Sequence, residues 1–98
     1  MTKEQNLKAM HTLQYYNGEK QMLKCVEELT ELTEAIMKHV NKGDNRAAIF
    51  EEIVDVEIMI AQMKVILPYG EDAYDVEIDR KLDRQLERIR SGKYEGRK

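Results

Sequence analysis

The segment from residue 45 to residue 67 most constrains the fold, because as a helix it is apolar on two opposite sides. One face carries Ile49, Ile53, Val56, Ile60, Met63 and Leu67. The other face carries Phe50, Val54, Ile58, Ala61 and Val65. A helix that is apolar on both sides is buried on both sides. A small chain can cover one such face but hardly two, so we expect the second face to be an interface between copies of the chain.

Three short breaks divide the rest of the chain into helices. The only proline, Pro68, and most of the glycines fall within residues 16–18, 41–44 and 67–70, and these residue types end helices and favour turns. The periodicity between the breaks predicts helices over the following ranges: 3–16, 19–41, 45–67 and 71–91. Asp44 is placed to cap the start of the third helix, and Gly43 suits a left-handed turn before it. Residues 92–98 carry no period and are expected to fray.

The length and the net charge of the chain limit the class of protein to which it can belong. With 98 residues, the chain suffices for a single domain with one modest core, and we predict an all-α, four-helix bundle-like domain assembled as a homo-oligomer. A net charge of -3 gives no overall bias toward nucleic acid. The first residues lack the apolar stretch of a signal peptide, and no apolar run reaches the length of a membrane span. A cytoplasmic protein without a membrane partner is therefore expected.

The second predicted helix has two stripes. A broad apolar stripe, the expected core face, carries Met22, Cys25, Val26, Leu29, Leu32, Thr33, Ile36 and Val40. A separate stripe beside it carries Lys24, Glu28, Glu31 and Ala35. The single cysteine lies on the apolar stripe, which favours a small buried hydrophobic residue over a catalytic thiol.

Two acid pairs stand out, Glu28-x-x-Glu31 and Glu52-x-x-Asp55, with a spacer of 20 residues between them. On a helix, an offset of three residues turns about 300° and rises about 4.5 Å, so each pair projects from one face. The second pair lies in one of the most apolar stretches of the chain. Two antiparallel helices would bring the four carboxylates together.

Such a cluster needs a counterion. Two ionised carboxylates about 6 Å apart repel by roughly 3 kcal/mol at an effective dielectric constant of 20, while a small domain is stable by only about 5 to 15 kcal/mol. Bound cations, raised pKa values or basic partners must neutralise the charge. An all-oxygen site suits Mg²⁺ or Mn²⁺, and Mg²⁺ held by carboxylates commonly also holds substrate phosphates.

Simpler interpretations of the acids stay open. Glu28 and Glu31 fit a solvated helix face paired with Lys24, and Glu52 and Asp55 fit a structural salt bridge to Lys81 or Arg84 of the fourth helix. The neighbouring acids Glu27 and Glu51 point elsewhere and are expected to be exposed, although Glu51 is also a candidate for a second metal ion. The two histidines, His11 and His39, lie near helix ends and are expected to be surface or structural residues.

The strings Glu27-Glu28-Leu29-Thr30-Glu31-Leu32 and Glu51-Glu52-Ile53-Val54-Asp55 resemble the MazG-like all-α nucleoside triphosphate pyrophosphohydrolases. That family has the signature E-x-x-E followed by E-x-x-D. The resemblance covers about residues 19–90 and includes Gln21 and the string Lys81-Leu82-Asp83-Arg84. It implies a Mg²⁺-dependent enzyme that hydrolyses NTPs or dNTPs to the monophosphate and pyrophosphate. The implied metal ligands and catalytic residues are Glu28, Glu31, Glu52 and Asp55.

Phosphate groups also need cations. Lys24 lies on the acidic stripe, and Lys81, Arg84 and Arg88 recur along one face of the fourth helix, where they could equally be solvated or paired with neighbouring acids. Because the resemblance reaches Lys81 and Arg84, we expect these two to bind the phosphates together with Lys24. The residues that bind the base are not identified by the sequence. Tyr15, Tyr16 and Asn17 could stack on a base, or could simply pack at a helix end.

Two other functions stay open. A phosphoribosyl-ATP pyrophosphohydrolase shares the E-x-x-E pattern, and a non-enzymatic helical interaction module would use the acids only as surface charge. Divalent-dependent release of pyrophosphate separates an enzyme from a module, and a panel of substrates separates the two enzymes.

Overall fold

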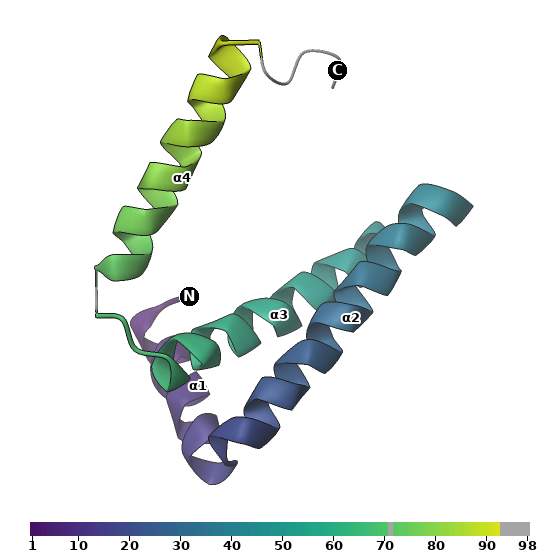
Figure 1. Ribbon diagram of the computed structural model, residues 1–98. Helices are drawn as coiled ribbons and strands as arrows, with labels where there is room; N and C mark the ends of the chain where they lie inside the picture. Colours follow the sequence, from purple (N-terminus) through teal and green to yellow (C-terminus); the bar gives the residue numbers. More distant parts are fainter. Residues whose placement is uncertain (71, 93–98) are drawn as a thin grey trace. The chain divides into compact units, whose positions relative to one another are not determined.

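A computed structural model describes residues 1–70 and 72–92. Its helices are α1 (Lys3–Tyr15), α2 (Gly18–Lys42), α3 (Arg46–Ile66) and α4 (Ala73–Arg90), and the described part contains no strand (Figure 1). The all-α class is therefore confirmed, and each helix begins and ends within about two residues of the predicted bounds. The predicted first residue of α4, residue 71, and all but the first residue of the predicted frayed tail lie outside the described residues.

Local sequence explains the starts of the first two helices. Thr2 and Gln5 form a capping box at α1, in which the Gln5 backbone N–H donates to Thr2 Oγ1 (3.1 Å) and the Thr2 N–H donates to Gln5 Oε1 (2.7 Å). At α2, Asn17 Oδ1 accepts from the Lys20 N–H (2.9 Å). Both caps satisfy backbone donors that the first turn of a helix leaves free.

The corner between α2 and α3 differs from the prediction. Asn45, not Asp44, occupies the N-cap position of α3, and its side chain makes no capping bond. Its Nδ2 instead donates back to the Ala35 carbonyl of α2 (3.1 Å), and Asp44 Oδ1, one position earlier, accepts from the Arg46 N–H (3.0 Å). Gly43 has φ +122° and ψ -178°, a conformation essentially restricted to glycine. The positive φ expected there is confirmed.

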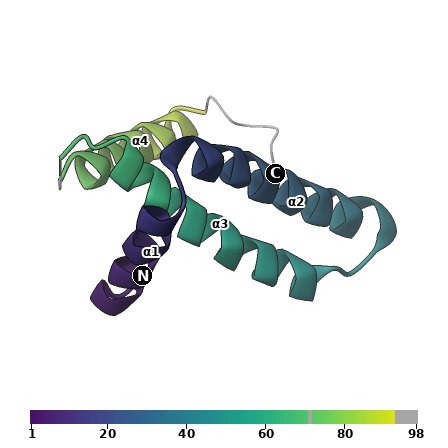
Figure 2. The same ribbon diagram turned by 90° about the horizontal axis from the view of Figure 1, so that it is seen from below.

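Helices α2 and α3 run antiparallel side by side, and α1 lies against α3 (Figures 1 and 2). Hydrogen bonds connect α2 to α3 or its N-cap at both ends of the hairpin. At the open end, Gln21 Nε2 donates to Gln62 Oε1 (2.7 Å), and at the loop end Asn45 bonds to Ala35. We call the contact stripe between the two helices the seam.

The seam is more polar than predicted. The buried residues of this helical unit are Ala9, Gln21, Cys25, Glu28, Ala35, Met59 and Gln62. Cys25 is buried as expected, and burial raises the pKa of its thiol. The expected core stripe of α2 is buried only in part, since Met22, Val26 and Val40 are exposed. Glu28 and Ala35 of the neighbouring stripe are buried against α3 together with Cys25.

The exposed stripe of α2 continues onto α3. On a helical wheel of about 100° per residue, the exposed stripe of α2 lies about 90° around the helix axis from the residues at the seam, and the first apolar face of α3 lies about 90° from its seam residues in the same sense. When two antiparallel helices are each turned by the same angle in the same sense from their contact, the two faces point to the same side of the pair. The hairpin therefore has one apolar side, which includes Leu29 and Ile36 of α2 and Ile53 and Ile60 of α3, all exposed.

The second face of α3 is covered only in part. Ala9 and Thr12 of α1 share a groove with Val54 and Ile58 of this face, yet Phe50 is still 67% exposed. Within residues 1–68, both apolar faces of α3 thus keep exposed residues.

The chain divides into two compact units, residues 1–68 and residues 69–98. Within the second unit, α4 carries ion pairs between Glu77 and Arg80 and between Glu87 and Arg90. Its apolar residues Val76, Leu82, Leu86 and Ile89 are exposed. Among the described helices of both units, none is long and apolar enough to cross a membrane.

Candidate metal centre

Three of the four motif acids meet at the seam. Glu28 and Glu31 project from α2 and Glu52 projects from α3, and one carboxylate oxygen of each lies within 4.8 Å of the other two. We call these three residues the acid cluster. Asp55 is exposed and lies outside this group, but its charge reaches Glu52.

The antiparallel register explains why the acids meet. Glu28 lies seven residues after Gln21 and seven before Ala35, which is about 10 Å along the helix in each direction. On α3, Glu52 lies seven residues after Asn45. The acid cluster therefore lies midway along α2, between the hydrogen-bonded contacts at the two ends of the hairpin.

Burial makes this position costly for charged groups. Glu28 is only 8% exposed, and Glu52 is half-buried. Glu28 Oε2 and Glu52 Oε2 are both buried, and neither has a hydrogen-bond partner among the described residues. Most buried side-chain polar atoms in folded proteins have a partner, so each exception requires an explanation such as an ion.

The pKa of Glu52 is raised. Its burial is the main cause, followed by the negative charges of Glu31, Asp55 and Glu28 and a hydrogen bond with Glu31. The fold thus places a carboxyl group where its charged form is disfavoured. A proton or a cation would relieve the repulsion.

Lys24 provides part of the compensation. Its Nζ lies 3.3 Å from Glu28 Oε1 and 3.6 Å from Glu27 Oε1, and the bond to Glu28 is the main cause of the raised pKa of Lys24. The predicted alternative of a Lys24–Glu28 pair is thus present, although Glu28 is buried rather than solvated. The pair engages Oε1 and leaves Glu28 Oε2 without a partner.

The donor set suits a hard cation. It consists of carboxylate oxygens, and the thiol of Cys25, one turn earlier on α2, does not belong to the group. Oxygen donors favour Mg²⁺, Ca²⁺ or Mn²⁺ over the softer metals that thiolate and imidazole select.

The predicted phosphate ligands of α4 lie in the other compact unit. Lys81 and Arg84 are exposed there, and both help to lower the pKa of Glu77 after the larger effect of its hydrogen bond with Arg80. Binding of phosphate by Lys81 and Arg84, and their alternative pairing with Glu52 and Asp55, both stay predictions.

The aromatic pair at the corner of α1 and α2 is exposed. The rings of Tyr15 and Tyr16 lie edge to face, with centroids 5.0 Å apart. Asn17 Oδ1 already accepts the hydrogen bond that caps α2, so this oxygen is engaged in the fold rather than offered to a base. A base site at this corner stays a prediction.

The remaining candidates have structural or surface positions. His39 Nδ1 accepts from the Asn45 N–H (3.0 Å) at the loop end, as expected of a structural histidine. His11, Glu27 and Glu51 are exposed, as predicted.

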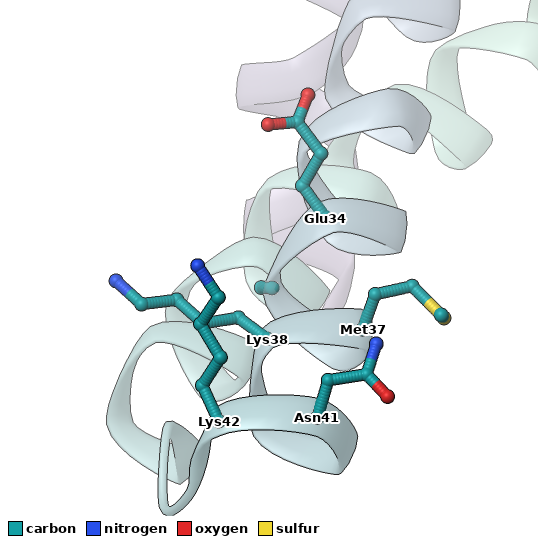
Figure 3. A pocket seen from close by; sticks show the side chains of 6 residues that line it. Glu34, Met37, Lys38, Asn41 and Lys42 are labelled. Atoms are coloured by element: carbon teal, nitrogen blue, oxygen red, sulfur yellow. The ribbon is translucent and has the colours of Figure 1, made fainter.

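Two hollows lined by described residues do not include the acid cluster. One lies near the C-terminal end of α2, where Lys38 and Lys42 extend their ammonium groups to the same side (Figure 3). Another follows the groove between α1 and α3 and is lined by Lys8 and Glu57 beside apolar residues. Neither marks a binding site for a base next to the acids.

Gln62 is the buried polar residue that the sequence reasoning missed. It is 1% exposed, accepts from Gln21 Nε2, and donates through Nε2 to the Ala9 carbonyl (3.1 Å). The available signal was an uncharged amide inside the apolar run Met59-Ile60-Ala61-Gln62-Met63. Such a residue is buried only with hydrogen-bond partners.

Comparison with known proteins gave no match to a protein-family model, to a curated protein or to a solved structure.

Proposed function

We propose that this protein is a Mg²⁺-dependent pyrophosphohydrolase that cleaves a nucleoside or deoxynucleoside triphosphate to the monophosphate and pyrophosphate. One observation carries the proposal: the acid cluster converges at the seam with two buried carboxylate oxygens that lack partners. A cluster of this kind binds cations, and the E-x-x-E and E-x-x-D spacing matches an enzyme class that uses them on triphosphates.

The proposed ligands of Mg²⁺, or of Mn²⁺ in its place, are Glu28, Glu31, Glu52 and Asp55. When bound, the ions would join the carboxylates to the substrate phosphates and polarise the attacking water. An acid that the metal does not fully engage would accept the proton of that water.

Basic side chains complete the proposed site. Lys24 already lies at the edge of the acid cluster, and its side chain is 48% exposed. Its ammonium group can therefore turn from Glu28 toward a phosphate without leaving the site. Lys81 and Arg84 are the proposed cations from α4. Fixed positive charges of this kind stabilise the negative charge that grows on phosphate oxygens during transfer.

We further propose that the working form is a homo-oligomer with a bundle-like core. The sequence predicts the second face of α3 as the interface, but α1 covers part of that face. We therefore propose the apolar side of the hairpin instead, where Leu29, Ile36, Ile53 and Ile60 are exposed. A contiguous apolar surface of this length is typical of a subunit interface. Two hairpins that pack by these sides would bury the stripes and leave the acid cluster at a separate edge.

The enzymatic test is direct. The protein is incubated with each NTP and dNTP, with and without Mg²⁺, and the products are resolved by phosphorus NMR. We expect pyrophosphate and a monophosphate only when Mg²⁺ is present. Release of orthophosphate and a diphosphate would contradict cleavage between the α and β phosphates.

Non-enzymatic use of the acids is the second candidate, and the Lys24–Glu28 ion pair favours it. In that case no triphosphate is cleaved at any divalent concentration. Light scattering tests the oligomer independently: Ile53→Glu with Ile60→Glu should lower the mass of the particle, and a wild-type monomer at micromolar concentration would contradict the interface.

A further inference from the structure

The most deeply buried polar side chain in the described part of the chain is Gln62, which lies outside the proposed metal site. At 1% exposure it is the one large side chain there that is fully buried. Its amide accepts from Gln21 of α2 and donates to the Ala9 carbonyl of α1. One side chain of α3 therefore binds both other helices of its unit.

The other buried contacts near the open end of the seam do not fix a register. Cys25 and Met59 are small or flexible side chains, and such side chains adapt to more than one alignment. Ionised acids do not favour alignment either, since like charges push the two helices apart. A hydrogen bond between two buried amides is directional and tolerates no slip.

We infer that Gln62 is a positioning residue for the acid cluster: through its bonds to Gln21 and Ala9 it holds α2 and α3 in the register that brings Glu28 opposite Glu52. The inference rests on the proposed metal site for its consequence in ion binding. Asn45 holds the loop end through Ala35, and Gln62 holds the open end. The repelling carboxylates lie between these two contacts.

The experiment uses full-length Gln62→Met, Gln21→Met and the double variant, with Gln85→Met as the control. Gln85 is an exposed glutamine of α4, so its replacement reports the effect of the residue change alone. Mn²⁺ affinity is measured by electron paramagnetic resonance, and stability is measured in parallel by urea unfolding without metal.

Each single variant should weaken Mn²⁺ binding by about tenfold, the lower end of the loss seen when groups that support metal ligands are removed. The double variant separates positioning from stability. Removing both amides leaves fewer unsatisfied polar atoms than removing one, so it should recover part of the lost stability. Its Mn²⁺ affinity should stay low, because an apolar contact does not restore the register. Recovery of affinity together with stability would overturn the inference.

A second measurement does not depend on ion binding. In a Cys25→Ala background, Glu28→Cys with Glu52→Cys is equilibrated in a glutathione buffer, and the fraction of disulfide reports how often the two positions meet. Adding Gln62→Met should lower the effective concentration of the two thiols by about tenfold. An unchanged effective concentration overturns the inference. If the thiols respond to Gln62→Met but wild-type protein does not bind Mn²⁺, only the proposed metal site is overturned.

Discussion

Two polar regions lie in the same seam and differ in how their groups are satisfied. At the open end, Gln21 and Gln62 bond to each other, and Gln62 also bonds to Ala9. In the middle, the acid cluster holds two buried oxygens without partners, on Glu28 and Glu52. Satisfied buried amides contribute rigidity, while unsatisfied buried carboxylates reduce stability until something binds them. The difference supports the proposal that the acid cluster binds a ligand, whereas the amides at the open end stabilise the fold.

The largest effect is expected from a substitution that removes the charge of Glu52 and so tests whether the acid cluster binds a ligand. Glu52→Gln keeps the shape of the side chain but loses a metal ligand, so we expect turnover to fall by about a thousandfold or more. The metal-free protein should be as stable as wild type or more stable, since the repulsion within the acid cluster is reduced. Pyrophosphate release and urea unfolding measure the two effects. A large loss of stability would instead make Glu52 half of a structural salt bridge.

The reverse substitution places a charge among the amides. Gln62→Glu cannot donate to the Ala9 carbonyl and introduces a buried carboxylate, so we expect a loss of about 2–4 kcal/mol in the free energy of unfolding. Urea unfolding at neutral pH gives this value, and Gln85→Glu is the matched surface control. Equal stability of the two variants would show that the open end is not the rigid region of the seam.

Adding metal ions should stabilise the protein through the acid cluster. A ligand that binds only the folded state stabilises it by about 2.7 kcal/mol at a hundredfold excess over its Kd, which corresponds to a rise in Tm on the order of 10 °C for a domain of this size. We expect this rise on adding Mg²⁺ or Mn²⁺ to wild type and a much smaller one for Glu52→Gln. Thermal unfolding followed by circular dichroism measures both, and Gln85→Met should respond like wild type.

The smallest expected effect concerns pH. Because the pKa of Glu52 is raised in the folded state, the fold binds its proton more tightly than the unfolded chain does. The stability that this proton contributes is complete below the ordinary pKa of glutamate and is lost as the pH rises through the higher pKa of the folded state.

Other carboxylates act in the opposite direction. The pKa of Asp44 is lowered, first by its hydrogen bond with the Arg46 side chain, and the pKa of Glu77 is lowered by Arg80. Their contribution is lost as the pH falls. The informative quantity is therefore the difference in Tm between wild type and Glu52→Gln in EDTA. Between about pH 4 and about pH 7, wild type should lose stability relative to the variant, and parallel curves would contradict the raised pKa.

Local sequence was enough to predict the helices and the two acid pairs. Pro68 and the glycine-containing breaks end helices by local backbone chemistry, so the four elements could be located without tertiary information. The spacing within each acid pair is also local, because three residues on a helix always share a face. That the two pairs meet also requires the face of α2 and the register that the fold adopts.

Only the tertiary structure decided which stripe of α2 faces α3. Hydrophobicity favoured the stripe with Val26 and Leu29, yet the single chain buries the one with Gln21 and Glu28. On our inference, the register depends on a bond between residues 41 positions apart in the chain, Gln21 and Gln62, and on the bond from Asn45 to the Ala35 carbonyl at the loop end. Periodicity ranks the faces of one helix, but which face a partner covers depends on the shape and hydrogen bonds of that partner.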